Sequence, residues 1–536
     1  MLITSDPELM RRMNGVRSSF TRGPWYAALK LHPERDNITS FVDERKHADI
    51  RSRMAPGYSG KENLTLEQDV DCTLLQMLNL VTEKYLNRPE QDVFRKIDLS
   101  RITSYFTLDV ISKVAFGQPF GFLDNDDDPF GYIENLKQFL PAIIVFGVYT
   151  ELTNILKIPL LKCALPKSTD KRGLGRVMGF AADRVRERFG NKPVTRPDML
   201  QAFIKKGLTQ AELESETLTQ ITAGSDSTAS SLRLTLHFIS TNPHVLSRLL
   251  AEANAGIEAG RISRPVIKDA EARQLPYLQA CIKEGLRIYP PVTGLLAKEV
   301  PRGGATIDVD GTEKFAPEGT QIGWNSWGMM RQESIFGSDV EIYRPERWLP
   351  RDGSEKERDR IHRMTETVSL AFGYGRFGCL GRGVATMELN KAIIEVCLCL
   401  IHFEGDTNTL CRLSCASTCS PAASQSPSKR MLLAFTSTTI WTLSSANAQT
   451  MPLRTTSRTA ILVLLPLPVL TMLEFLHVQR NCNRFGEGVV DTTRKYPRLR
   501  IRSFNKTMLD RTPSCHTVST MHVCPKTLLF RSLHTY

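Results

Sequence analysis

The sequence predicts a mainly α fold with a small β region over residues 1–396. Apolar residues recur at helical spacing in long stretches such as 100–117 and 213–240, which favours helices that bury one face. Residues 293–326 alternate short apolar runs with the turn signals "RGG", "VDG" and "PEG", which indicates short strands joined by turns. After about Val396 neither a helical nor a strand period persists.

The helices can be placed in chain order. In "SDPELMRRM", Ser5 and Glu8 have the spacing of a capping box, which predicts a helix start at Ser5. A basic helix in "DERKHADIRSRMAPGYSG" is expected to end near Pro56 and Gly57. Further helices are expected at 100–117, ending at a glycine, and at 213–240, 243–258, 274–289 and 380–396.

Length and charge limit the function classes. The 536 residues allow several domains or one large one, and 41% hydrophobic residues are enough for a sizeable core. The net charge is +12, but residues 397–536 hold 16 Lys and Arg against 6 Asp and Glu. Residues 1–396 are therefore nearly neutral, and nothing in them supports nucleic-acid binding.

Cysteine usage indicates the compartment. Eight of the 12 cysteines lie at or after Cys397, and Cys72, Cys163, Cys281 and Cys379 lie far apart, without metal-finger spacing. This pattern suits a reducing compartment without structural disulfides. The start "MLITSDPELMRRM" lacks the apolar core of a secretory signal, and the run "ILVLLPLPVL" at 461–470 is too short and too proline-rich to span a membrane.

A change of amino-acid composition near Val396 divides the chain into two parts. From residue 397 to residue 536 Ser, Thr, Cys and Arg become frequent, while acidic residues nearly vanish. We interpret 397–536 as an atypical tail that is disordered or non-native, for example a retained intron or a shifted reading frame. Residues 1–396 then form the functional domain.

The stretch "AFGYGRFGCLGRG", residues 371–383, places glycines around Cys379 just before an expected helix. Thiolates bind iron, and backbone N–H groups tune such a sulfur where glycines let the backbone approach it. Gly375, Gly378 and Gly381 could provide that approach, the helix start would direct its positive end at the sulfur, and Phe372 could shield it from water. Two alternatives remain at this point: the loop could cradle a phosphate, or Cys379 could be an inert buried thiol.

A second motif, "AGSDST" at 223–228, lies inside the long helix. Ala223 and Gly224 are small enough for a flat ligand to lie against that face. An acid followed by a hydroxyl, as in Asp226 and Ser227 with Thr228 next to them, suits a proton relay to dioxygen. The alternative is a helix kink with exposed polar residues.

A third motif is structural. In "KEGLRIYPP", 283–291, Glu284 and Arg287 share one helix face and can pair, and "YRPERW", 343–348, offers Arg347 as a second cation for the glutamate. Taken alone, such pairs are usually surface decoration.

These motifs, in this order, resemble the cytochrome P450 family of haem-thiolate monooxygenases over about residues 2–396. The cysteine loop resembles the family's F-x-x-G-x-R-x-C-x-G, and "AGSDST" resembles its oxygen-activating helix. Glu284, Arg287 and Arg347 match its Glu-Arg-Arg triad, and "HADIR" at 47–51 falls where the family has W-x-x-x-R. The wording of several stretches, such as "RQLPYLQACIKEGLRIYPPVTGLL", looks most like fungal members of the pisatin-demethylase-like group.

The resemblance implies a role for each of these residues. Cys379 would be the axial thiolate of the haem iron. Asp226 and Ser227, with Thr228, would deliver protons, while Glu284, Arg287 and Arg347 would hold the core. The residues implied to contact haem are Arg51, His47 and Arg376 at the propionates, with Phe372, Gly375, Gly381, Ala223 and Gly224 around the ring.

The sequence departs from the family's pattern at single positions. Phe377 stands where the family usually has an arginine two residues before the cysteine, and Arg376 lies one residue earlier. Ser227 stands where the family usually has threonine, and it keeps the hydroxyl with more rotamer freedom. His47 replaces the tryptophan and could still donate a hydrogen bond.

The two ends also differ from the family. The membrane anchor, proline-rich hinge, first helix and first strands would lie before the first residue, so strands in 293–326 are expected to lack their sheet neighbours and to expose edges. The C-terminal strands that help to line the substrate pocket are expected to be missing after Val396.

The resemblance implies oxidation of a small apolar molecule, a fungal secondary metabolite or a xenobiotic, by dioxygen and two electrons from NADPH. A reductase would deliver the electrons to a monomeric chain. One alternative keeps the haem fold but performs isomerase or dehydratase chemistry. Another is a truncated, non-catalytic product that binds no haem. Family members are anchored in the endoplasmic reticulum and face the cytosol; without an anchor segment, this chain is expected to be cytoplasmic or loosely membrane-associated.

Overall fold

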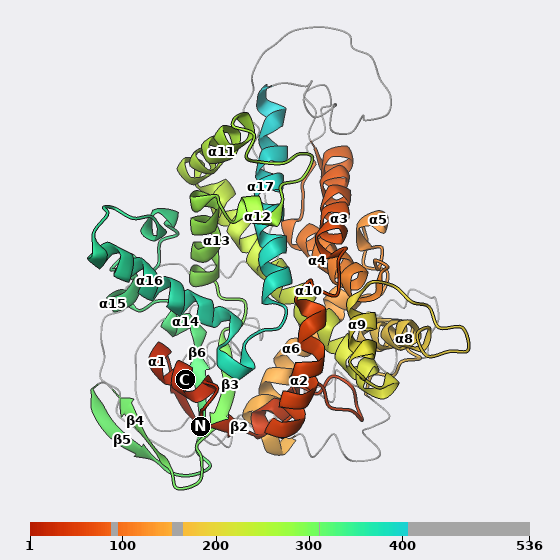
Figure 1. The fold of residues 1–536 in the computed structure, drawn as a ribbon, viewed down its shortest axis with the longest axis vertical. Coiled ribbons are helices and arrows are strands. Elements are labelled where there is room, and N and C mark those ends of the chain that lie inside the picture. Colours follow the sequence, from red (N-terminus) through yellow and green to blue (C-terminus); the bar gives the residue numbers. More distant parts are fainter. Residues whose placement is uncertain (87–94, 153–164, 310, 406–536) are drawn as a thin grey trace, which may run out of the picture. The chain divides into compact units, whose positions relative to one another are not determined.

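The structure is a computed structural model that describes residues 1–86, 95–152, 165–309 and 311–405. It is mainly helical, which confirms the predicted fold class (Figure 1). The longer helices are α1 (Pro7–Asn14), α2 (Glu44–Tyr58), α3 (Leu66–Leu80), α4 (Leu99–Phe116), α6 (Tyr132–Val148), α8 (Gly173–Arg186), α10 (Gln210–Thr241), α11 (Pro243–Glu258), α13 (Pro276–Ile288), α16 (Glu355–Ser369) and α17 (Arg382–Gly405). Short helical elements are η1 (Pro24–Leu29), η2 (Val81–Tyr85), α5 (Phe122–Asn125), α9 (Met199–Lys205), α12 (Asp269–Ala272), α14 (Ser326–Met329), α15 (Glu333–Phe336), η4 (Pro345–Trp348), η5 (Leu370–Phe372) and η6 (Gly375–Phe377).

Local chemistry explains the helix boundaries. Helix α4 ends at Gly117, whose φ of 75° lies in the left-handed region that favours glycine. Helix α10 begins with a capping box between Thr209 and Glu212. The start of α1 differs from the prediction, because Asp6 and not Ser5 caps the helix. The Asp6 carboxylate accepts hydrogen bonds from the backbone N–H groups of Glu8 and Leu9.

The main sheet contains four strands in the order β1 (Leu2–Thr4), β6 (Gln321–Asn325), β3 (Gly294–Glu299) and β2 (Thr21–Arg22). Strand β1 runs parallel to β6, and the other two pairs are antiparallel. The expectation that strands in 293–326 lack sheet neighbours is therefore wrong for β3 and β6, because the first residues of the chain pair with both. Strands β4 (Ala305–Val309) and β5 (Thr312–Ala316) form a separate antiparallel pair.

Helix α10 is the centre of the helical core, and α4, α8, α13 and α17 pack against it (Figure 1). Glycines allow two of these helices, α13 and α4, to pack closely against α10. A Cβ atom on Gly285 would lie 2.1 Å from the Thr235 hydroxyl, so α13 can approach α10 only with glycine there. A Cβ atom on Gly224 would lie 3.0 Å from the Ile111 side chain of α4.

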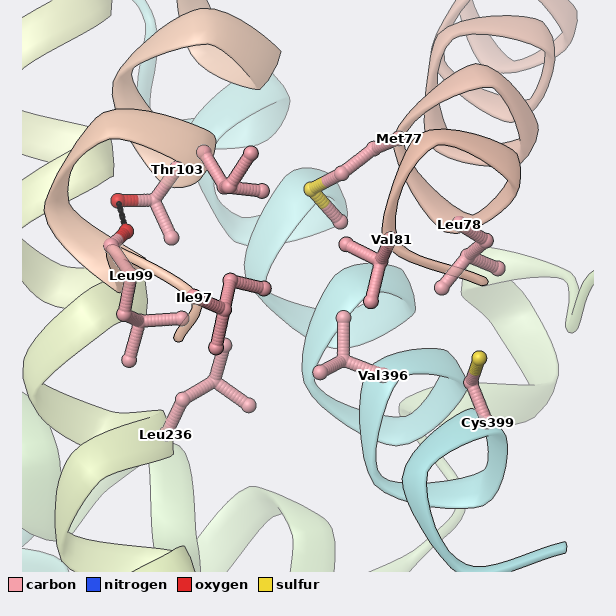
Figure 2. A pocket seen from close by; sticks show the side chains of 10 residues that line it. Met77, Leu78, Val81, Ile97, Leu99, Thr103, Leu236, Val396 and Cys399 are labelled. Carbon is pink, nitrogen blue, oxygen red and sulfur yellow. Dashed lines mark hydrogen bonds between the residues drawn. The ribbon is translucent and has the colours of Figure 1, made fainter. Parts of the chain in front are cut away.

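A small cavity of about 30 Å³ lies among α3, η2, α4, α10 and α17 (Figure 2). Its wall is apolar, because the Thr103 hydroxyl donates to the Leu99 carbonyl oxygen of its own helix over 2.8 Å. None of the predicted site residues lines it. A cavity of this size without polar partners is expected to stay dry, so we interpret it as a packing gap. The lining residues are Met77, Leu78, Val81, Ile97, Leu99, Ile102, Thr103, Leu236, Val396 and Cys399.

Helix α17 continues past the predicted boundary at Val396 and ends at Gly405. The rest of the predicted tail, 406–536, lies outside the described residues, so its interpretation stays a prediction. Within the described part of the chain, no helix combines the length and apolar character needed to cross a membrane.

Candidate functional site

The loop before Cys379 consists of the two short turns η5 and η6. The backbone N–H of Cys379 donates to the Phe372 carbonyl oxygen over 2.7 Å, which closes the loop. Gly375 has a φ of 56°, and a Cβ atom there would lie 2.3 Å from the Asn14 carbonyl oxygen. Only glycine fits this position, because the loop crosses the end of α1 at contact distance.

Backbone donors reach the Cys379 sulfur from the start of α17. The N–H groups of Gly381 and Arg382 donate to it. Burial raises the pKa of the Cys379 thiol above its ordinary value, and these two hydrogen bonds and the positive charge of Arg51 offset only part of that rise. The donors are directed at the sulfur itself, which fits a sulfur ligand better than a phosphate cradle.

Two aromatic rings lie at this loop, and Cys379 itself is exposed. A Cβ atom on Gly381 would lie 3.9 Å from the sulfur and 4.0 Å from the Tyr58 ring at the end of α2. The Phe372 ring packs against the main core, and the guanidinium carbon of Arg382 lies over this ring, 5.4 Å from its centroid. The loop therefore contacts α2 through Tyr58 and α17 through Arg382.

The "AGSDST" motif lies in the unbroken helix α10. Ala223 is exposed, and Ser227, one turn later, is partly exposed on the same face. The Ser227 hydroxyl donates to the Ala223 carbonyl oxygen over 2.8 Å. Asp226 is also partly exposed, whereas Thr228 is buried.

Gly224 lies on a different side of α10 from Ala223. Its contact with Ile111 of α4 shows that its small size serves close packing between the two helices. Of the two small residues predicted to border a flat ligand, the open face of α10 thus presents Ala223.

Four basic residues gather beside the loop, and we call them the cation cluster: Arg22 of β2, Arg51 of α2, Lys298 of β3 and Arg376 of η6. All four lower the pKa of the His47 imidazole, which burial and their charges bring to about 3. His47 therefore remains neutral and keeps an N–H to donate.

Negative charge is scarce around the cation cluster. Within the described ranges none of its members forms an ion pair, and Glu44 is the carboxylate that acts on both Arg22 and Lys298. Three of its buried nitrogens lack a hydrogen-bond partner: the Nε atoms of Arg22 and Arg376 and the Nζ atom of Lys298. Burial and the nearby arginines lower the pKa of Lys298 to about 6. Because uncompensated buried cations are costly, the cluster fits a bound group with two negative charges.

Arg376 contacts the N-terminal segment. One of its Nη atoms donates to the carbonyl oxygens of Ser18 and Phe20, over 3.3 Å and 2.9 Å, while its Nε atom stays free for another partner. The structure thus brings Arg376 to the same cluster as Arg51 and His47.

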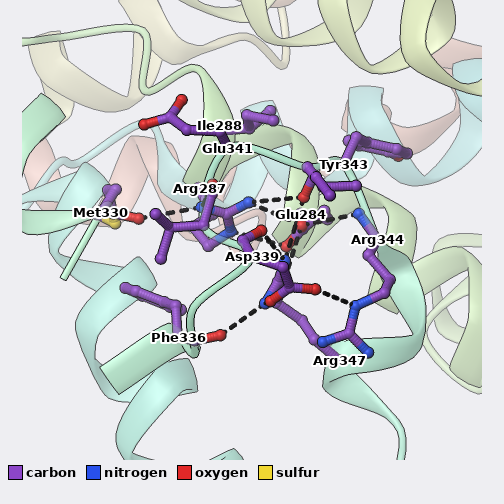
Figure 3. A network of polar contacts seen from close by, with 12 residues as sticks. Glu284, Arg287, Ile288, Met330, Phe336, Asp339, Glu341, Tyr343, Arg344 and Arg347 are labelled. Atoms are coloured by element: carbon purple, nitrogen blue, oxygen red, sulfur yellow. Dashed lines mark hydrogen bonds and ion pairs between the residues drawn. The ribbon is translucent and has the colours of Figure 1, made fainter. Parts of the chain in front are cut away.

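The structure also brings Glu284, Arg287 and Arg347 together (Figure 3). All three side chains are fully buried, and Glu284 Oε1 accepts from Arg287 Nη2 over 2.8 Å and from Arg347 Nε over 2.9 Å. Trp348 and the backbone N–H of Arg344 also donate to this carboxylate. Arg347 Nη1 also pairs with the Asp339 carboxylate over 2.9 Å. The guanidinium N–H groups that bind neither carboxylate donate to backbone carbonyl oxygens, so the network ties α13 to the segment 336–348.

Comparison with known proteins decides the family. The sequence profile described as Cytochrome P450 matches residues 1–408. The chain belongs to the cytochrome P450 family. Fungal relatives carry the name cytochrome P450 monooxygenase, and such enzymes are oxidoreductases. The relative ABA1 of Pyricularia oryzae is 40% identical over 397 residues, which are 74% of this chain and 76% of the relative.

Two further relatives show similar coverage. The cytochrome P450 monooxygenase aba1 of Botryotinia fuckeliana is 38% identical over 396 residues, 74% of this chain and 76% of the relative. The cytochrome P450 monooxygenase abl1 of Leptosphaeria maculans is 35% identical over 396 residues, 74% of this chain and 68% of the relative.

The residues present fit the haem that this family implies. The Cys379 sulfur already receives two N–H donors, and the cation cluster lacks the anions that two propionates would supply. Two cluster members, Arg22 and Lys298, were not predicted from the sequence. The sequence does contain a hint of Lys298, because a lysine within the otherwise apolar strand "GLLAKEV" is unusual. It contains none for Arg22, which lies in a strand of only two residues.

Proposed function

We propose that this cytochrome P450 chain is a haem-dependent monooxygenase. It inserts one oxygen atom from dioxygen into a small apolar organic substrate, with electrons that pass from NADPH through a reductase. The observation that carries the proposal is the Cys379 sulfur with its two N–H donors, beside a cation cluster whose members form no ion pair among the described residues. The family membership adds to this observation.

The chain holds haem through both features. Cys379 binds the iron as a thiolate, and the donors on Gly381 and Arg382 keep negative charge on the sulfur. Haem bound in this way supplies the activation of dioxygen, and thiolate ligation favours O–O cleavage. The cation cluster and the neutral imidazole of His47 bind the propionates.

The polar residues of α10 move protons in this proposal. The Asp226 carboxyl group, partly open to solvent, exchanges protons with water, and the Ser227 hydroxyl passes them on. The Ser227 oxygen is free to accept a hydrogen bond, because its own hydrogen is directed to the Ala223 carbonyl oxygen; when a proton arrives at this oxygen, that hydrogen leaves the carbonyl and passes to the next acceptor. Thr228, one residue further along the helix, is buried, so we assign it to supporting α10.

The buried network around Glu284 holds the fold rather than taking part in chemistry. Its charges are satisfied internally, and neither Arg287 nor Arg347 has a donor left for a substrate. We further propose that residues 1–396, with the continuation of α17, form a monomeric functional domain. Placement in the cytoplasm, or loosely at a membrane, belongs to the same proposal.

Turnover with isotopically labelled dioxygen tests the proposed function. The full-length chain is purified with haem and combined with an NADPH-dependent reductase and small apolar molecules that shift its haem absorbance. Incorporation of one labelled oxygen atom into product, only when reductase is present, supports the proposal. Unlabelled product formed without reductase supports an isomerase or dehydratase instead, and failure to bind haem supports a non-catalytic product.

A further inference from the structure

Phe377 occupies the loop position where the family usually has arginine, and cations surround its ring. The Lys298 ammonium lies 2.9 Å from the ring centroid, and the guanidinium carbons of Arg376 and Arg22 lie 4.9 Å and 5.2 Å from it. An aromatic face attracts a nearby cation through its quadrupole. The ring therefore supplies attraction for positive charge at a position where an arginine would repel it.

A second ring fixes the orientation of Phe377. The His47 imidazole stacks on it, with centroids 5.3 Å apart and planes at 26°. His47 is 2% exposed and comes from α2, so it holds the ring from the helix that also carries Arg51.

Lys298 depends on these rings, because its side chain has no polar partner. Its backbone lies in β3, where Lys298 is the register partner of Arg22 in β2 on one side and of Ile322 in β6 on the other. The side chain is fully buried and its Nζ atom makes no hydrogen bond. Its ammonium contacts the ring of Phe377 and lies 5.2 Å from the centroid of the Tyr26 ring.

We propose that Phe377 is a positioning residue: its ring holds the Lys298 ammonium where the lysine meets a haem propionate. The proposal rests on the proposed function, since it takes haem to be bound at Cys379. An arginine at position 377 would add a positive charge beside the cation cluster, which has Glu44 as its nearby carboxylate. It follows that this chain accommodates Lys298 or an arginine at position 377, but not both.

A double-variant cycle tests this exclusion. The full-length variants Phe377→Arg, Lys298→Met and Phe377→Arg/Lys298→Met are compared with wild type by haemin titration of the haem-free protein and by the rate of haem loss to an excess of a haem-binding acceptor. We expect each single variant to weaken haem binding about tenfold or more. The double variant should bind more tightly than either single variant, because one cation is restored without like-charge repulsion. The inference is overturned if Phe377→Arg binds haem as tightly as wild type, or if the double variant is no better than the single ones.

Conservative variants separate the ring's attraction for the cation from simple packing. Phe377→Tyr keeps the aromatic face and should retain wild-type haem affinity. Phe377→Leu keeps an apolar side chain without that face, and should lose haem faster than Phe377→Tyr. Equal haem loss from the Tyr and Leu variants would contradict a positioning role.

The haem-free chain distinguishes failure of this inference from failure of the proposed function. If wild type forms no thiolate-ligated haem, the proposed function fails. The thermal unfolding midpoints of the same haem-free variants then still test the contact between Lys298 and the Phe377 ring. They are measured at a pH below the pKa of Lys298, where the lysine is charged. A lowered midpoint in Phe377→Arg that Lys298→Met partly restores supports it, and strictly additive effects overturn it.

Discussion

The hydroxyl group of Ser227 donates to the carbonyl oxygen of Ala223, one turn earlier on α10, over 2.8 Å. This bond orients the hydroxyl on the face of the helix that is open around Ala223. It also leaves the lone pairs of the oxygen available to accept a hydrogen bond from a neighbouring donor. The smaller serine can therefore serve the relay that we propose with Asp226.

Variants at Ser227 test the relay. Ser227→Ala removes the hydroxyl and should lower the product formed per electron pair on the order of 10²-fold, with the electrons appearing as hydrogen peroxide. Ser227→Thr keeps the hydroxyl and should stay near wild type. Product and peroxide are measured together in the reconstituted system. Unchanged coupling in Ser227→Ala would rule out this hydroxyl as a relay.

A stability prediction concerns the buried carboxylate of Glu284. Glu284→Gln leaves Arg287 buried without its counter-charge and leaves Arg347 with the Asp339 carboxylate alone, so the free energy of unfolding should fall by about 3–5 kcal/mol. Glu341→Gln is the matched control, because Glu341 pairs with Arg331 at the surface and is 70% exposed. The control should stay within about 1 kcal/mol of wild type in denaturant unfolding. Equal effects of the two variants would contradict the assigned role of the network.

Glu216 on α10 gives a pH prediction. Burial raises the pKa of this carboxyl from its ordinary 4.5 to about 8, although it accepts a hydrogen bond from the Ile38 N–H over 2.7 Å. Because the folded chain then binds this proton more tightly than the unfolded chain, the contribution to stability is complete below about pH 4.5 and is lost as the pH rises through about 8.

Wild type and Glu216→Gln therefore respond differently to pH. The glutamine cannot ionise, so the stability of wild type relative to the variant should fall by up to about 1.4 kcal/mol per pH unit within this range. Denaturant unfolding at several pH values measures the difference. Parallel pH curves for the two proteins would show that Glu216 does not titrate as described.

The tail gives a prediction at the level of the transcript. If 397–536 is a non-native reading, sequencing of transcripts across the codons for 390–400 should find a spliced message that leaves this frame. A mature message that continues in the same frame through the tail would contradict the interpretation. Cys379 and residues 382–396 of helix α17 precede the tail, so the change of frame is expected to spare them.

The elements that the sequence predicts well are those fixed by local chemistry. The helix 243–258 matches α11, because Pro243 opens it and its apolar spacing is regular. The helix ending at Gly117 and the strands in 293–326 follow from glycine and turn signals in the same way. The motif around Cys379 is equally local, since loop, sulfur and helix start lie within a few residues.

Features that depend on distant segments could not be predicted in this way. The pairing of β1 and β2 with β6 and β3 joins the first residues of the chain to strands near residue 300. The cation cluster likewise draws Arg22 and Lys298 from opposite parts of the sequence, and only the fold shows that both lie around Phe377. Gly224 faces α4, which its motif alone does not indicate.

The carbon-monoxide difference spectrum of the reduced full-length chain tests the central claim, thiolate ligation by Cys379, most directly. Wild type should retain haem and show the Soret shift that is characteristic of a thiolate ligand. Cys379→Ser should abolish that shift, whereas the control variant Cys72→Ser, at an exposed cysteine of α3, should preserve it. A wild-type chain that binds haem without the shift, or a Cys379→Ser variant that keeps it, would contradict the account.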